Sequence, residues 1–323
     1  MKHLVTMGEL LIDFIPLEKG RKLKEVTGFT KYPGGAPANV AVAGVKSGIS
    51  SYFIGQVGKD AFGDYLVDCL KNEGVNCDNL YQSSIANTAL AYVTLSDAGE
   101  RDFIFYRDPS ADQLLHANQV EESILKDCVF HFCSVSLCDY PIRDAHIKAI
   151  DSARLQGGFI SFDPNLRLSL WKDHNAYRDV IQSFLPKADL LKISNDELSF
   201  ITGIPDETSA IKSLFIGHVK YVIITRGSQG STFFFKSGNH IDVPAFKVQV
   251  VDTTGAGDAF IGTFLAEMIK RNLDFSNNHV EDALIIANAK AALTTTKFGG
   301  MSSIPNDDEY QRFIHQNNTK KDQ

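Results

Sequence analysis

Residues 188–202, ADLLKISNDELSFIT, join an apolar strand to a helix and decide the fold class. The strand (188–194) ends at Ser194, and Glu197 follows three residues later, which is the capping-box pattern that opens a helix over 195–202. The same alternation recurs on both sides, with expected strands HFCSVSL (131–137), GFISFDP (158–164) and KYVIIT (220–225) and expected helices at 141–156, 174–185 and 207–217. Strands that are apolar on both faces and separated by helices predict a parallel sheet covered by helices on each side.

The bulk composition is that of a globular enzyme. The chain has 323 residues, 44% of them hydrophobic and 22% charged, which is enough for one large α/β domain or two medium ones. A net charge of −7 argues against general nucleic-acid binding, because no basic surplus displaces counterions. The five cysteines include no C-x-x-C pair, which predicts reduced thiols. No run approaches the ~20 apolar residues of a membrane span, and the N-terminus lacks signal-peptide features, so we expect a cytoplasmic protein without a membrane partner.

Two regions interrupt the alternation. Residues 88–107, TALAYVTLSDAGERDFIFYR, are typical of two strands around a DAG turn, and residues 12–32, before Pro33, are rich in strand formers without a helix. Two such pieces inserted into an α/β body predict a small sheet standing off the main one. Such a sheet can act as a lid over the carboxyl ends of the strands, where open α/β folds bind ligands.

The stretch 251–260, VDTTGAGDAF, combines an anion-binding loop with an acid. Gly255, Ala256 and Gly257 allow successive N–H groups to point one way, and the apolar residues from Asp258 onward follow helical spacing. Asp258 places a carboxylate where it repels a phosphate. The loop does not fit a dinucleotide fingerprint, because Phe260 occupies the third glycine slot, and it lacks the lysine and spacing of a Walker loop.

Phosphoryl transfer to a hydroxyl group is the reaction that needs both features at once. The N–H groups and the helix N-terminus stabilise charge on the transferred phosphoryl group, while the aspartate accepts the proton of the attacking hydroxyl. The failed fingerprint disfavours a dehydrogenase.

Other segments allow both a structural and a functional interpretation. PGGAPANVAVAG (33–44) is either a turn before a tightly packed helix or a backbone that admits a ligand bound by Asn39. Asp13, in an apolar strand, faces either a ligand or the solvent at a sheet edge. Lys192, at a strand end, is placed for a phosphate or a metal-bound water, and TRGSQG (225–230) is either a tight turn or a nucleotide loop.

Taken together, these segments resemble the ribokinase-type (PfkB) carbohydrate kinases over residues 3–305. GGAPANVAVAGVKSG and FIGQVGKDAFG are similar to the family's N-terminal signature, and DTTGAGDAFIGTF to its more specific C-terminal one. GELLIDFIP, FYRDPSADQLL, FDPNLRLSLW and KISNDELSFITG most resemble the fructokinase branch. The resemblance implies one α/β domain over residues 1–323, a ribokinase-like three-layer sandwich with a mostly parallel central sheet flanked by helices and a small β-sheet lid with strands near 12–32 and 88–107.

The resemblance also implies roles for individual residues. Catalysis is expected from the base Asp258 and from an anion hole formed by Gly255, Ala256 and Gly257. The implied sugar-binding residues are Asp13, Gly34, Gly35, Asn39, Arg107 and Arg167. The implied ATP-side residues, with Mg²⁺ accompanying the nucleotide, are Lys192, Glu197, Thr225, Gly227, Gly230 and Asn288. The implied positions around a monovalent cation, usually potassium, are Asp252, Thr254, Thr294, Lys297, Gly299 and Ser303.

One position departs from the family pattern. Many members carry N-x-x-E after the strand near residue 190, and here Ser194 replaces the asparagine while Glu197 remains. Fructokinase-like sequences resemble this variant, so we interpret it as a mark of the subtype, and Ser194 is left without an assigned role in binding Mg²⁺ or phosphate.

The expected activity is transfer of the γ-phosphate of ATP to the primary hydroxyl of D-fructose, which gives fructose 6-phosphate. One alternative is 2-keto-3-deoxygluconate kinase, whose acid substrate Arg107 or Arg167 would bind bidentately; another is a different sugar or nucleoside kinase of the family. From a different class, the fold would serve as a catalytically inactive sugar-binding regulator, but Asp258 and both loop glycines are present. An open lid edge predicts a homodimer through the lid.

Overall fold

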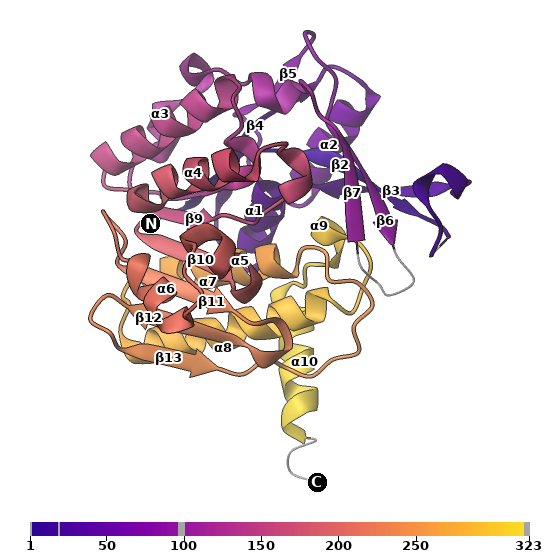
Figure 1. Cartoon of the computed structure of the whole chain (residues 1–323). Coiled ribbons are helices and arrows are strands. Elements are labelled where there is room, and N and C mark those ends of the chain that lie inside the picture. The colour runs from indigo at the N-terminus through magenta and orange to yellow at the C-terminus, as the bar shows by residue number, and fades with distance from the viewer. Residues whose placement is uncertain (1, 19, 96–100, 320–323) are drawn as a thin grey trace.

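The computed structural model describes residues 2–18, 20–95 and 101–319, and these form one large and one small β-sheet (Figure 1). The large sheet has the strand order β13-β12-β11-β10-β9-β8-β1-β4-β5. Its strands are β1 (Leu4–Met7), β4 (Ser51–Gly58), β5 (Leu80–Ser83), β8 (Val129–Cys133), β9 (Phe159–Asp163), β10 (Leu190–Ser194), β11 (Tyr221–Thr225), β12 (Ser231–Phe235) and β13 (His240–Val243). Its neighbouring strands from β5 to β11 pair in parallel, whereas β12 pairs antiparallel with both β11 and the edge strand β13.

Helices cover both faces of the large sheet, because successive side chains of a strand point to opposite faces. In β10, Leu190 packs in the core formed with α7 (Ala256–Lys270) and α8 (Asn277–Thr294), whereas Leu191 and Ile193 belong to the core on the other side. That second core contains α3 (Pro141–Leu155), α4 (His174–Phe184), α5 (Asn195–Thr202) and α6 (Glu207–Ser213). The remaining helices are α1 (Ala36–Lys46), α2 (Ala61–Asn72), α9 (Gly300–Ser303) and α10 (Asp307–Thr319). The three-layer α/β sandwich is therefore confirmed.

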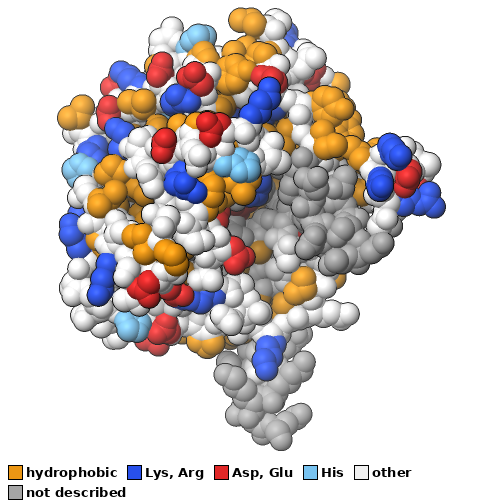
Figure 2. Space-filling view, viewed as in Figure 1, with side chains coloured by type: hydrophobic (Ala, Val, Ile, Leu, Met, Phe, Trp, Pro, Cys, Tyr) orange, Lys and Arg blue, Asp and Glu red, His pale blue; other side chains and the backbone are white. Residues whose placement is uncertain are grey.

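The small sheet, which we call the lid sheet, stands off one end of the large sheet (Figure 1). Its strand order is β3-β2-β6-β7, and its strands are β2 (Leu11–Pro16), β3 (Phe29–Gly34), β6 (Leu90–Leu95) and β7 (Arg101–Tyr106). The strands expected near 12–32 and 88–107 are thus confirmed, while the expected DAG turn at 97–99 lies outside the described residues. The connection between β2 and β3 carries the exposed Arg21, Lys22 and Lys24, and its tip projects from the molecule with these basic side chains (Figure 2).

Several expected boundaries are wrong. The strand expected over 131–137 ends at Cys133, because Ser134 to Ser136 turn into a 3-10 helix in which the Ser134 N–H bonds to the Pro164 carbonyl. The helix expected over 207–217 ends at Ser213. The helix expected from Asp258 begins two residues earlier, at Ala256.

None of the described helices is long and apolar enough to cross a membrane. The five cysteines, all within the described part of the chain, are free thiols, as the sequence predicts.

Candidate active site

The first turn of α7 forms the centre of the site. Gly255 is the N-cap and has φ 77°, and a Cβ there would lie 2.9 Å from the Cα of Gly300, so the position requires glycine. The N–H groups of a first helical turn have no partner inside their own helix, and they carry the positive end of the helix dipole. The turn at Gly255, Ala256 and Gly257 therefore has the backbone geometry of an anion site.

Asp258 lies in the same turn and is only 7% exposed. The amide of Asn39 donates to its Oδ2 at 2.8 Å, and the amide of Asn165 donates to its Oδ1 at 3.3 Å. Burial raises the pKa of Asp258, and the Asn39 hydrogen bond and the charges of Lys192 and Arg167 oppose that rise. The Oδ1 of Asn39 is a buried acceptor without a partner among the described residues, which leaves it available to a ligand hydroxyl.

A cavity of about 340 Å³, the first cavity, opens between the strand ends and the lid sheet. Leu11, Asp13 and Phe105 of the lid form one side of it. Residues of the large-sheet body form the rest, among them Glu9, Gly35, Asn39, Val135, Asn165, Arg167, Lys192, Thr254, Gly255 and Asp258. It thus lies at the carboxyl ends of the parallel strands, where the sequence predicts the ligand site.

A second cavity of about 570 Å³ lies on the other side of the α7 N-terminus. It is lined by the turn after β11, by the loop 245–250 and by α8, including Thr225, Gly227, Gly230, Phe246, Asn288 and Ala292. Thr253 and Gly257 line both cavities. The anion-site backbone therefore stands where the two cavities meet.

Lys192 brings a fixed positive charge to this meeting point. A Cβ at Gly257 would lie 3.1 Å from the Lys192 ammonium nitrogen, which itself donates to the Asp163 carboxylate at 2.8 Å. Burial alone would lower the pKa of Lys192, but the carboxylates of Asp163 and Glu197 more than offset it and raise that pKa. Lys192 is thus an ammonium group beside the anion site.

The family model of the pfkB carbohydrate kinases matches residues 1–307. The chain belongs to this family of carbohydrate kinases. Fructokinase-2 of Zea mays is 44% identical over 304 residues, which are 93% of this chain and 90% of the maize protein.

Two solved structures of fructokinases with bound ligands share this fold. A fructokinase of Xylella fastidiosa with bound ATP superposes with a TM-score of 0.90 at 32% identity and covers 98% of this chain and 100% of its own. A double mutant of the fructokinase of Vibrio cholerae O395, bound to fructose, ADP and a potassium ion, has a TM-score of 0.86 at 33% identity and covers 97% of this chain and 98% of its own.

The structure brings most residues of the predicted sugar group together. Asp13, Gly35, Asn39 and Arg167 line the first cavity, and a Cβ at Gly34 would lie 2.1 Å from an Asp13 carboxylate oxygen. Arg107 is placed differently from the expectation of a substrate contact. Its guanidinium donates to Asp112 and to the carbonyl of Val135 and is almost fully buried, so these groups, rather than a ligand, satisfy it.

The nucleotide-side residues of the pfkB pattern surround the second cavity only in part. Thr225, Gly227, Gly230 and Asn288 line it, and the Asn288 amide donates to Ser231 and to the Val243 carbonyl. Glu197 instead accepts the N–H groups of Leu166 at 2.6 Å and of Ser194 at 2.8 Å. Glu197 therefore fixes the backbone at the ends of two strands, and Ser194 serves as the N-cap of α5.

The predicted cation positions converge on one loop cluster next to the anion site. Asp252 accepts from the N–H and the hydroxyl of Thr254, both at 2.8 Å, and from the N–H of Gly299 at 3.1 Å. The hydroxyls of Thr294 and Ser303 bond to main-chain carbonyls, and the ammonium of Lys297 pairs with Glu309. Hard oxygens suit an alkali ion, so Asp252 and the carbonyl groups of this cluster, rather than the Lys297 side chain, fit such a ligand set.

Two polar residues of the first cavity that sequence reasoning missed, Asn165 and Glu9, bear on the chemistry. Asn165, which bonds to Asp258, adopts φ 46°, and this left-handed conformation leaves no pattern in the sequence beyond its asparagine. Glu9 precedes β2 and was included in the apolar strand GELLIDFIP, although its carboxylate is 2% exposed and lines the cavity. A buried carboxylate in an apolar segment is the signal that would have identified it.

Proposed function

We propose that this protein is an ATP-dependent fructokinase that transfers the γ-phosphoryl group of ATP to the 6-hydroxyl of D-fructose. One observation carries the proposal: the two cavities meet at the N-terminus of α7, with Asp258 lining the first and Gly257 lining both. The likeness to fructokinases over nearly the whole chain supports fructose as the acceptor.

In this reaction the sugar lies in the first cavity and ATP in the second. The Asp258 carboxylate accepts the proton of the 6-hydroxyl while that oxygen attacks the γ-phosphorus and the bond to the leaving oxygen of ADP breaks. The N–H groups of the α7 first turn stabilise the charge of the transferred group. Lys192 adds positive charge at the same place.

Two ions support the phosphates. Mg²⁺ bound to the phosphates would neutralise charge on the ATP oxygens. The buried carboxylate of Asp163 is already bound by the Lys192 ammonium group, so it offers little to a metal ion. We therefore infer that ATP itself, with water, supplies most Mg²⁺ ligands. The cluster around Asp252, which joins the loop before α7 to Gly299, would hold potassium, and the ion would add support to that loop.

The decisive measurement is ADP release with fructose, ribose, a nucleoside and 2-keto-3-deoxygluconate, each with and without potassium. We expect fructose to give the highest kcat/KM and potassium to raise the rate. Asp258→Ala is the matched variant, and it should lower kcat by about 10²- to 10⁴-fold while sugar binding remains.

A preference for the acid sugar would overturn the fructose assignment. Tight sugar binding without ATP turnover would instead support the inactive regulator. The paired guanidinium of Arg107 argues against the acid sugar, since it already has its carboxylate partner in Asp112.

We also propose that two copies associate through their lid sheets. The two edge strands of the lid sheet are β3 and β7. Phe105 of β7 lines the first cavity, so its neighbours Ile104 and Tyr106 point to the opposite face, where they are 42% and 63% exposed. A second lid sheet would cover these apolar side chains.

A further inference from the structure

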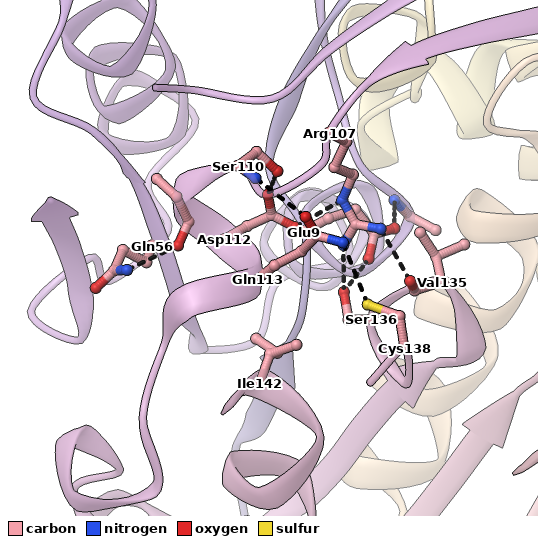
Figure 3. A network of polar contacts seen from close by, with 12 residues as sticks. Glu9, Gln56, Arg107, Ser110, Asp112, Gln113, Val135, Ser136, Cys138 and Ile142 are labelled. Carbon is pink, nitrogen blue, oxygen red and sulfur yellow. Dashed lines mark hydrogen bonds and ion pairs between the residues drawn. The ribbon is translucent and has the colours of Figure 1, made fainter. Parts of the chain in front are cut away.

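A buried polar cluster lies next to the first cavity, and we call Glu9, Arg107, Asp112 and Ser136 the hinge clamp (Figure 3). The guanidinium of Arg107 donates to Asp112 Oδ2 from Nε at 2.8 Å and from Nη2 at 2.5 Å. It also donates to the Ser136 hydroxyl at 3.3 Å. That hydroxyl in turn donates to Glu9 Oε2 at 2.8 Å, so one hydroxyl links the arginine to the second carboxylate.

The members of the clamp stand where the chain passes between the two sheets. The chain enters the lid sheet twice and leaves it twice. Glu9 lies in the first entry, between β1 and β2, and its Oε1 accepts the N–H of Ala36, which follows the first exit after β3. Arg107 is the first residue after β7 and marks the second exit. The clamp therefore ties three of the passages to one another.

The second entry of the chain into the lid sheet is attached to the second exit by a main-chain hydrogen bond. The Ala111 N–H donates to the Asn87 carbonyl at 2.8 Å, just before β6 begins. The neighbouring Thr88 donates to Asp60, the N-cap of α2, from both its N–H and its hydroxyl. Each passage of the chain between the two sheets is thus bonded either to the clamp or to Asp60, the N-cap of α2.

The chemistry and burial of the clamp favour one fixed geometry. Arg107 is always charged, and its planar fork fits one carboxylate geometry. Breaking a buried pair of this kind leaves a charge without a partner, which is strongly unfavourable. The Arg107 and Asp112 side chains are 2% and 1% exposed, so little water is available to replace either partner.

The clamp also contacts the elements that hold the reacting groups. Glu9 lines the first cavity and bonds to the N-terminus of α1, the helix that presents Asn39 to Asp258. Val135, whose carbonyl accepts from Arg107, lines the same cavity. In the second cavity, by contrast, the lining residues come from 225–230, 245–260 and 288–295, none of which includes a clamp residue.

We propose that the hinge clamp is the fixed pivot of the lid sheet and that Arg107, Asp112 and Ser136 are positioning residues for the sugar. The inference rests on the proposed kinase function, because it needs a sugar in the first cavity. It assigns Arg107 to lid placement through Asp112, in place of direct contact with substrate. Its consequence is an asymmetry: disturbing the clamp weakens sugar use and leaves ATP use intact.

Steady-state kinetics of Arg107→Lys and Ser136→Ala test this asymmetry. Lysine keeps the charge but loses the fork, so KM for fructose should rise about tenfold or more while KM for ATP stays within about twofold. Ser136→Ala deletes only the bridging hydroxyl, and its KM for fructose should rise about 2- to 10-fold. The melting temperature of each variant shows that it is folded.

Each variant has a matched control in the body. Arg154→Lys makes the same change in a pair with Asp189 at 3.2 Å, and Ser161→Ala removes a buried hydroxyl bonded to His131 at 3.0 Å. Both should lose some thermal stability without separating the two KM values. A folded Arg107→Lys protein with wild-type KM for fructose, or equal shifts for both substrates, overturns the proposal.

The two proposals fail in distinguishable ways. Wild-type turnover of fructose tests the proposed function, and the ratio of the KM changes tests the clamp. If the wild type prefers another sugar, that sugar replaces fructose in the same comparison, and the predicted asymmetry is unchanged.

Discussion

Asp258 shows how one carboxylate is prepared to accept a proton. Burial raises its pKa, while the Asn39 amide and the charges of Lys192 and Arg167 lower it, and the net shift is upward from 3.8. The ionised form, which acts as the base, is therefore present above the raised pKa and is lost as the pH falls through it. The acid limb of activity should lie at a higher pH than an exposed aspartate would give.

Changing Asn39 to alanine tests this balance. The substitution removes a hydrogen bond that favours the ionised carboxylate, so the pKa of Asp258 should rise further. The acid limb of kcat/KM should then move to higher pH than in the wild type. Asn165→Ala removes the longer contact and should move it less. A limb that stays in place, or moves to lower pH in Asn39→Ala, would contradict the assignment of Asp258 as the titrating base.

Single residues were predictable where a local pattern determines them. The glycines around Asp258 stand in one short motif, and the structure places them in one helical turn. Arg107 was misplaced because its charge is visible in the sequence, whereas the fact that Asp112, five residues later, satisfies it depends on a fold of the backbone. Asn165 was missed because no motif marks it, whereas Asn39, which contacts Asp258 over a longer stretch of chain, stands in a recognisable motif.

At the scale of elements, α7 acts as a rigid platform for the anion site. Every residue from Asp258 to Ile269 is buried, so the helix is fixed on all sides. Its N-terminus is held by Asp252, which joins the loop before the helix to Gly299. The orientation of the first-turn N–H groups therefore depends on a loop cluster that is not itself part of the helix.

The dependence of the reaction rate on potassium should require Asp252. Asp252→Ala leaves the donors of Thr254 and Gly299 without their acceptor. We expect the potassium response to vanish and kcat to fall by about 10²-fold, because the anion site loses its alignment. Rates are measured against potassium chloride with tetramethylammonium chloride holding the ionic strength constant. Asp252→Asn, which keeps one acceptor oxygen, should retain part of the response, and a full response in Asp252→Ala would place the cation elsewhere.

Elements were predicted well where periodicity is strong. The helices expected at 174–185 and 195–202 agree with α4 and α5 to within one residue, because caps and apolar spacing point the same way. β8 ends earlier than expected at Cys133. The sequence around Ser134 is compatible with a strand, but Ser134 bonds to Pro164 and Tyr177 instead. That preference comes from a neighbouring strand and helix, so no local pattern contains it.

At the scale of the whole molecule, the two sheets differ in how far their faces and edges are covered. The large sheet is closed by helices on both faces, whereas the lid sheet leaves strand edges and an apolar outer face open in the described structure. The overall arrangement followed from the alternation of strands and helices and from the two regions that interrupt it. The bonds that fasten the passages between the two sheets did not follow from these patterns, because Ser136, far from both in the sequence, links Glu9 to Arg107.

The lid pairing predicts a dimer in solution. Light scattering of the eluting protein should give twice the mass of one chain. Ile104→Lys should shift the equilibrium toward the single chain, since it places a charge on the outer lid face. Ile216→Lys is the control, because Ile216 is also 42% exposed but lies in the body. A single-chain mass for the wild type, or equal effects of both changes, would contradict pairing through the lid.

The two asparagines at Asp258 also bear on what happens when ATP arrives alone. Both carboxylate oxygens already accept amide hydrogens, from Asn39 and from Asn165. Each oxygen keeps a second lone pair, so a water molecule can still reach the base, but it lacks the many contacts with which a sugar would be held in place for attack. We therefore expect slow hydrolysis of ATP in the absence of sugar, because a lone water molecule is not held in line with the phosphate.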